Sequence, residues 1–155
     1  MSQKPALTAD EQLLNPRDRF SAGDWKSAFA QRTAAGFADA FAEDIVLEAT
    51  TLTRPVQGRE QVTVVMAAAS KLYKSVDFTA TATVGAKQYL EWVAEAHAGV
   101  QFSGVTVLTR DPTGAIVHVA IHHRPMAAAI FFSETMGKSL RDELDPTYFL
   151  NEHTA

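Results

Sequence analysis

The chain has 155 residues, of which 46% are hydrophobic and 21% charged, a balance that is ordinary for a globular protein of one domain. Its formal net charge is −4 and its lysines and arginines are scattered, so we expect neither nucleic acid nor an anionic membrane as a partner. The absence of cysteine excludes disulfides, thiolate catalysis and cysteine-based zinc sites.

The amino-terminal segment, residues 1–17, contains two prolines and little hydrophobic periodicity, which predicts an arm that is loose or draped over the body. Residues 1–19 lack the run of about seven or more apolar residues that a signal peptide requires, so we expect a cytoplasmic protein. The longest apolar run, at 126–132, is far shorter than the roughly 20 residues that cross a bilayer. We therefore expect no membrane span.

Residues 20–44 place large apolar side chains at spacings that suit one face of a helix. These side chains are Phe20, Trp25, Phe29, Phe37 and Phe41. Residues 31–33 separate two predicted helices, with Thr33 as the N-cap of the second. Residues 44–52 are rich in β-branched and apolar side chains and predict a strand.

The middle of the chain predicts one helix followed by a series of strands. Residues 58–76 repeat apolar side chains at steps of three and four, which is typical of an amphipathic helix. Three or four strands follow, within residues 76–84, 87–97, 99–110 and 115–124. Pro112 and Gly114 predict a hairpin turn between the last two, and residues 126–144 predict a final helix.

This order of helices, strand, helix and antiparallel strands predicts an α+β domain with helices on one face of a curved sheet. Three segments, 36–49, 56–62 and 104–119, also carry a family resemblance. The chain resembles the nuclear-transport-factor-2-like superfamily in its SnoaL-like branch, which includes polyketide cyclases, ketosteroid isomerase and limonene epoxide hydrolase.

The resemblance covers about residues 20–124 and implies a cone-shaped, mixed or antiparallel sheet. N-terminal and middle helices would close this sheet around a deep apolar pocket, and the predicted C-terminal helix adds to it. It also implies a homodimer through the outer face of the sheet. We divide the chain into an arm (1–17), a SnoaL-like domain (18–140) and a C-terminal tail (141–155).

Three of the five histidines, His118, His122 and His123, lie within six positions. On a strand, His118 and His122 share a face but stand about 13 Å apart at roughly 3.3 Å per residue. His122 and His123 point to opposite faces. A zinc site needs imidazole nitrogens about 2 Å from one ion. We therefore expect no metal site, and the chain carries no nucleotide-binding motif that would predict a cofactor.

The resemblance places apolar residues where related enzymes carry acid–base groups. Ala49 stands at the position of the isomerase base, and Ile121 at that of the cyclase and hydrolase aspartate. Trp92 and Ala94 stand where epoxide hydrolases carry an arginine and a carboxylate. The resemblance thus implies a pocket without those carboxylates.

Strand alternation gives an independent test, because the inward residues of a half-buried strand are its apolar set. In residues 87–97 the predicted inward set is Leu90, Trp92, Ala94 and Ala96, and the outward set is Glu91, Glu95 and His97. In the last strand the predicted inward set is Val117, Val119, Ile121 and His123, and the outward set is Ile116, His118, Ala120 and His122. We expect the outward histidines to face Glu91 or Glu95, or to lie in a subunit interface. A register shifted by one residue would exchange every assignment.

His123 is the catalytic candidate, because the ordinary pKa of imidazole lies near neutrality, although no carboxylate is visible to orient it. Two interpretations are open for Trp92: its ring stacks on a flat ligand, or it is an ordinary core residue. The Tyr73 hydroxyl likewise either binds a ligand carbonyl or belongs to an ordinary surface or core tyrosine. Arg54 binds a carboxylate at the pocket mouth or is simply exposed. The expected ligand-binding residues are Ala49, Arg54, Tyr73, Leu90, Trp92, Ala94, Val119 and Ile121.

Three functions follow from the sequence. The first is a protein that binds a small apolar or cyclic molecule without assured catalysis. The second is an isomerase, cyclase or hydratase that works through His123 with help from Tyr73 or Arg54. The third is a dimeric interaction module whose cavity is filled by side chains.

Overall fold

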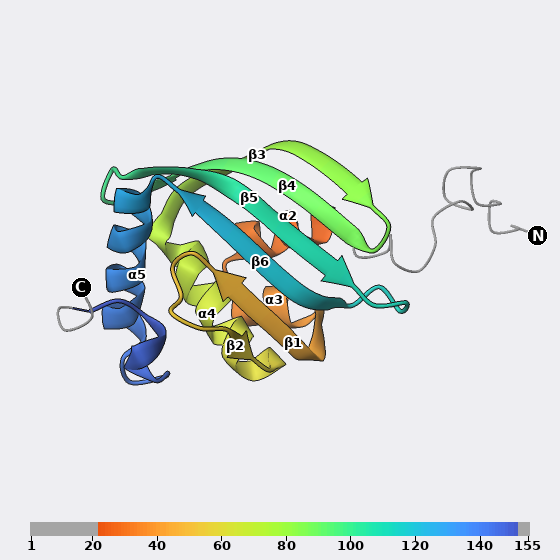
Figure 1. Cartoon of the computed structure of the whole chain (residues 1–155), viewed down its shortest axis with the longest axis horizontal. Coiled ribbons are helices and arrows are strands. Elements are labelled where there is room, and N and C mark those ends of the chain that lie inside the picture. The colour runs from red at the N-terminus through yellow and green to blue at the C-terminus, as the bar shows by residue number, and fades with distance from the viewer. Residues whose placement is uncertain (1–21, 152–155) are drawn as a thin grey trace, which may run out of the picture.

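The computed structural model describes residues 22–151, with an α+β architecture in which strands curve over helices (Figure 1). The arm predicted at residues 1–17 lies outside the described part. The helices are α2 (Ala22–Gln31), α3 (Ala34–Ala38), α4 (Arg59–Leu72), α5 (Met126–Leu140) and the short 3-10 helix η2 (Pro146–Tyr148). The strands are β1 (Phe41–Ala49), β2 (Val56–Gln57), β3 (Tyr73–Val84), β4 (Lys87–Ala96), β5 (Gln101–Arg110) and β6 (Ile116–Arg124).

The sheet is open and mixed, with the strand order β2-β1-β6-β5-β4-β3. β1 runs parallel to β6, whereas all other neighbouring pairs are antiparallel. The ladder of β3 and β4 shifts register twice, after Tyr73 and after Phe78, and such irregularities bend and twist a strand. The predicted α+β class with a curved sheet is confirmed.

Helices α2 and α3 are separated at residues 32–33, as the sequence predicted. The Thr33 side chain accepts a hydrogen bond from the Gly36 amide, which confirms it as the N-cap of α3. Trp25 and Phe29 from α2 pack edge-on against Phe37 from α3, with ring centroids 5.7 Å and 5.4 Å apart. This aromatic contact fixes the two helices to each other and forms one side of the core.

Helix α4 lies against the sheet with its apolar face buried. That face carries Val62, Val65, Met66 and Ala69 at the predicted steps of three and four residues. The helix ends at Leu72, and the chain passes directly into β3 at Tyr73. The helix therefore delivers the first residue of β3 to the interior of the fold.

The predicted alternation of β4 is confirmed. Its inward residues Leu90, Trp92, Ala94 and Ala96 are all buried. Glu91 and His97 are exposed and Glu95 is half-buried. Because a single residue of slip would reverse this pattern, the pattern fixes which face of β4 borders the core.

The prediction for the start of β6 is wrong at Ile116, which is 0% exposed instead of facing outward. The β5–β6 ladder shifts register between Thr109 and Arg110, so Ile116 pairs with Arg110 while His118 pairs with Thr109. The extra residue at this bulge, Val117, breaks the period of two. From Val119 onward the predicted faces hold, since Val119 and Ile121 are buried and His122 is exposed.

Helix α5 follows β6 and packs across the end of the sheet (Figure 1). The chain then turns back through η2, and Phe149, in the segment predicted as a tail, is 1% exposed. No helix within the described residues is long and apolar enough to cross a membrane.

Candidate functional site

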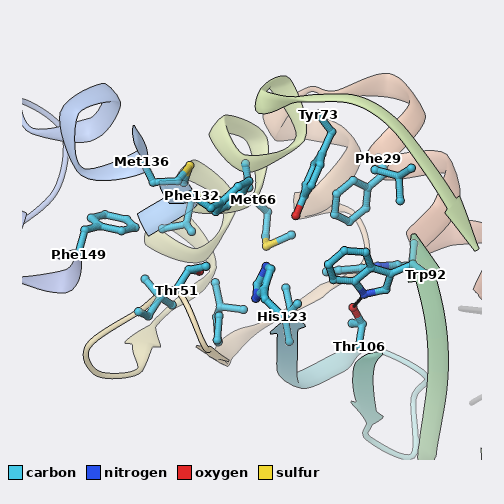
Figure 2. Close-up of a pocket in the computed structure, with 18 of the residues that line it drawn as sticks. Phe29, Thr51, Met66, Tyr73, Trp92, Thr106, His123, Phe132, Met136 and Phe149 are labelled. Atoms are coloured by element: carbon cyan, nitrogen blue, oxygen red, sulfur yellow. Dashed lines mark hydrogen bonds between the residues drawn. The ribbon is translucent and has the colours of Figure 1, made fainter. Parts of the chain in front are cut away.

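A pocket lies between the concave face of the sheet and the helices, and Figure 2 shows the side chains around it. The cavity between these side chains has a volume of about 30 Å³, and its mouth is open to solvent. The residues that line it are Trp25, Phe29, Leu47, Ala49, Thr51, Leu52, Val65, Met66, Ala69, Tyr73, Val76, Phe78, Trp92, Thr106, Ile121, His123, Phe132, Met136 and Phe149. None of these residues carries a formal charge when His123 is neutral.

Five residues singled out by the sequence lie together in this lining. They are Ala49, Tyr73, Trp92, Ile121 and the catalytic candidate His123. Leu90, Ala94 and Val119 are buried in the core but do not line the pocket. All three lie on the predicted inward faces of their strands and belong to the hydrophobic core.

Trp92 is held flat against β5 by two features of that strand. Its Nε1 donates a hydrogen bond of 3.0 Å to Thr106 Oγ1, a buried contact that satisfies the indole donor. The Trp92 ring also lies directly over Gly104. A Cβ added at residue 104 would stand 2.7 Å from Trp92 Cζ2 and 2.1 Å from the His122 carbonyl oxygen. Only glycine leaves room for the ring at this point.

His123 projects from β6 into the pocket (Figure 2). Its ring lies between Trp92 and Phe132, with centroid distances of 5.5 Å and 5.6 Å. The backbone amide of His123 donates to Thr50 Oγ1, but the ring atom Nδ1 is buried and has no hydrogen-bond partner among residues 22–151. One nitrogen of the imidazole is therefore unpaired in the described part of the chain.

Burial lowers the pKa of His123 from 6.5 to about 4. The backbone of Ile121 opposes this shift in part, and the neighbouring His122 adds to it. The imidazole is therefore neutral at physiological pH, when it can donate one hydrogen bond and accept another.

Tyr73 enters the pocket from the opposite side and is 4% exposed. Its ring stacks on Phe132 at 5.2 Å and meets Trp92 edge-on at 6.3 Å. Burial raises the pKa of the Tyr73 hydroxyl far above its usual range, so the group stays protonated and can donate a hydrogen bond.

The end wall of the pocket was not predicted from the sequence. Ser133 of α5 is 0% exposed, and its Oγ donates to the Thr51 carbonyl at 2.7 Å and accepts from the Leu150 amide at 2.9 Å. This places Thr51 and Phe149, from segments far apart in the chain, beside each other at the pocket. The apolar triplet at residues 148–150, after Pro146 in an otherwise polar tail, is the signal that would have indicated a packed segment.

Arg54 does not line the pocket. Its guanidinium donates to Asp145 at 3.0 Å and to Thr147 at 3.1 Å, and it stacks over the Tyr148 ring at 3.7 Å. The backbone and hydroxyl of Thr147 together with Arg54 lower the pKa of the Asp145 carboxyl. Arg54 thus joins the loop after β1 to the C-terminal segment.

The outward histidines lie apart from the pocket. His118 Nε2 lies 2.8 Å from Glu48 Oε2 on the neighbouring strand β1, so its acidic partner is Glu48 and not Glu91 or Glu95. Within residues 22–151, no group of three histidine, aspartate or glutamate side chains is arranged to hold a metal ion.

No protein-family model and no curated protein sequence matches this chain. Solved structures match its fold. A steroid delta-isomerase from Pseudomonas aeruginosa superimposes with a TM-score of 0.75 at 20% sequence identity, covering 83% of this chain and 95% of that one. An NTF2-like protein of unknown function from Mesorhizobium loti has a TM-score of 0.61 at 19% identity, covering 70% of this chain and 94% of that one.

A protein with a ketosteroid isomerase-like fold from Catenulispora acidiphila, in complex with trimethylamine, has a TM-score of 0.60 at 16% identity. That match covers 72% of this chain and 90% of the other. Identities this low establish a common fold and leave the chemistry of each pocket to its own residues.

Proposed function

Because this chain has the nuclear-transport-factor-2-like fold, an α+β cone with an inner cavity, we propose that it binds a small, flat, mainly apolar molecule in that cavity. The SnoaL-like branch remains a prediction from the sequence. The proposal follows from this chain's own lining, since the fold alone is shared by unrelated functions.

The observation that carries the proposal is the apolar, ring-lined wall of the pocket. Tyr73 meets Trp92 edge-on and stacks on Phe132, and the His123 ring lies beside both Trp92 and Phe132. Flat aromatic walls bury large apolar area and favour planar ligands. A largely apolar pocket with few polar groups is the usual form of a small-molecule site.

Naphthalene, a flat bicyclic hydrocarbon, tests the proposal. Its binding requires the pocket side chains to move apart, because the cavity between them has a volume of about 30 Å³. We expect isothermal titration calorimetry to show binding at one site. An Ala49→Phe variant, which places a ring in the pocket, would abolish that binding. The matched change Ala82→Phe, at an exposed position of β3, would leave it intact. Absence of binding by the wild-type protein, or equal binding by both variants, would contradict the proposal.

A second function, acid–base catalysis on a bound ring compound, is favoured by the unpartnered nitrogen of His123. In such an isomerase, cyclase or hydratase, neutral His123 would accept a proton and Tyr73 would donate a hydrogen bond to a ligand oxygen. The pocket lining holds no carboxylate to orient the imidazole, so binding without turnover is the function better supported by the described residues. Catalysis would become the better supported function if the rate of turnover depended on pH with a single apparent pKa near 4 and if turnover were lost in His123→Leu.

A further inference from the structure

The pocket is too small for an organic ligand in the arrangement that the structure shows. Its cavity has a volume of about 30 Å³, which is room for about one or two water molecules. A ligand ring can therefore enter only if part of the wall moves. The elements that form the wall differ in how they are held, and this difference indicates which part moves.

Most of the wall belongs to elements with continuous backbone hydrogen bonding. β1 and β3–β6 are paired in one sheet, and α2, α4 and α5 are helices. The exceptions are the loop after β1, which connects the paired strands β1 and β2, and residues 145–150, which we call the C-terminal strap. Within the described chain, the strap contains one single-turn helix, η2, and belongs to no strand. Segments held in this way open at a lower free energy than core helices and strands do.

The strap is fastened mainly by side-chain contacts at the surface. The Arg54 guanidinium donates to Asp145 at 3.0 Å and to Thr147 at 3.1 Å, and both contacts are exposed. The same guanidinium stacks over the Tyr148 ring. The backbone amide of Thr53 donates to the Tyr148 carbonyl at 2.9 Å. Exposed ion pairs contribute little stability, because water competes for both partners. The fastening can therefore break while the sheet stays intact.

The side chain that the strap sends inward is Phe149, which is 1% exposed and lines the pocket. Gly137 of α5 permits this packing, since a Cβ added at residue 137 would stand 3.0 Å from Phe149 Cβ. Glycine inside a helix is unfavourable compared with alanine, and here it leaves the space that the strap fills. Figure 2 shows Phe149 at the end of the pocket opposite Trp92. The phenyl ring thus occupies volume that a flat ligand ring of similar size could fill.

We propose that the C-terminal strap holds the pocket closed and that a ligand displaces it, with a ring of the ligand taking the place of the Phe149 ring. Phe149 is then an occupant that the chain itself supplies. Because the closed state does not bind, the apparent affinity equals the affinity of the open state multiplied by the fraction of molecules that are open. A change that loosens the strap must therefore strengthen binding. This inference rests on the proposed function.

Two aspartates that cap similar turns provide matched variants. Asp145 accepts from the backbone and hydroxyl of Thr147 and from Arg54, all at the strap. Asp111 accepts from the backbone and hydroxyl of Thr113 in the turn between β5 and β6, away from the pocket lining. By isothermal titration calorimetry, we expect Asp145→Ala to bind naphthalene on the order of 3-fold more tightly than the wild type. Asp111→Ala would bind with the wild-type affinity. Urea unfolding checks that both variants are folded.

Hydrogen–deuterium exchange tests the displacement itself. We expect saturating naphthalene to speed exchange at the Leu150 amide, which donates to Ser133, and at the Thr53 amide, which donates to Tyr148. A ligand that binds without moving the strap would leave these amides unchanged or would protect them, because a ligand of the folded state suppresses opening. Faster exchange at the strap on binding is therefore specific to its displacement.

The outcomes separate this inference from the proposed function. If the wild-type protein does not bind naphthalene, the proposed function fails and the inference fails with it. If naphthalene binds but the strap amides do not exchange faster, or if Asp145→Ala binds no more tightly than Asp111→Ala, the strap is not the part of the wall that moves. The inference is then overturned while the proposed function stands.

Discussion

His123 couples the stability of the fold to pH. In the unfolded chain it takes up a proton near its ordinary pKa of 6.5, whereas in the folded protein it does so only near pH 4. Between these values the unfolded state binds more protons, so the free energy of unfolding falls as the pH is lowered. The contribution is fully present above pH 6.5 and is lost towards pH 4, with a slope of at most about 1.4 kcal/mol per pH unit.

Urea unfolding between pH 7 and pH 4 measures this slope. We expect His123→Leu to reduce the dependence, and His97→Leu, at an exposed position, to leave it as in the wild type. An identical slope in His123→Leu and the wild type would show that the imidazole is not buried as described.

Gly104 controls the position of Trp92. In Gly104→Ala the new methyl group would overlap the His122 carbonyl and the Trp92 ring. We expect a loss of stability on the order of 1–3 kcal/mol, as for other overpacked interiors. A changed near-ultraviolet circular dichroism spectrum would accompany this loss as the indole moves. Gly36→Ala serves as the control, because there the added Cβ meets mainly the flexible end of the Gln31 side chain. Unchanged stability in Gly104→Ala would contradict the close contact.

At the scale of elements, Ser133 joins α5, the loop after β1 and the C-terminal segment. In Ser133→Ala the Leu150 amide and the Thr51 carbonyl lose a buried partner, at a cost on the order of 1–3 kcal/mol. We expect faster hydrogen–deuterium exchange at residues 148–150. The control is Thr135→Ala, whose hydroxyl bonds only within α5 to the Phe131 carbonyl. Equal exchange in the two variants would contradict the role of Ser133.

Elements with regular periodicity were predictable, and irregular ones were not. The faces of β4 followed from strict alternation, and the α2–α3 break from the capping residue Thr33. The face of Ile116 was predicted wrongly because a bulge interrupts β6 before His118. The position of this bulge depends on how β6 pairs with β5, and the alternation of residues within β6 carries no information about that pairing. Arg54 resembled a free cation in the sequence, because its partner Asp145 lies 91 residues away.

The candidate site was predictable in part for the same reason. Inward strand positions such as Trp92, Ile121 and His123 reached the pocket as alternation indicated. The end wall depends on the chain returning over α5, which brings Phe149 to the cavity. The apolar triplet at residues 148–150 indicates a packed segment but not the surface against which it packs. The cavity itself arises from the curvature of the whole sheet.

At the scale of the whole molecule, the outer face of the sheet carries a patch of apolar and charged side chains. Val93 is 45% exposed and Tyr89 38% exposed on β4, and Tyr89 lies beside Val107 of β5. On the same face Val105 lies between Glu91 and His122. We propose that a second copy of the chain covers this patch, as the homodimer predicted from the sequence requires, because exposed apolar residues on one face of the sheet suit a two-fold contact.

Light scattering coupled to size-exclusion chromatography tests the dimer. We expect the wild-type protein to elute as a dimer and Val93→Lys as a monomer, because a lysine would be buried opposite its own copy. Val84→Lys, at a residue that is 69% exposed at the end of β3, would remain dimeric. A wild-type monomer at high protein concentration would contradict the proposal.

The most direct test of the account is a crystal structure of the protein grown with naphthalene. The account predicts the ligand's rings in the pocket lined by Trp92, His123 and Phe132. A cavity that stays empty at saturating ligand, or a ligand found only on the outer face of the sheet, would contradict it.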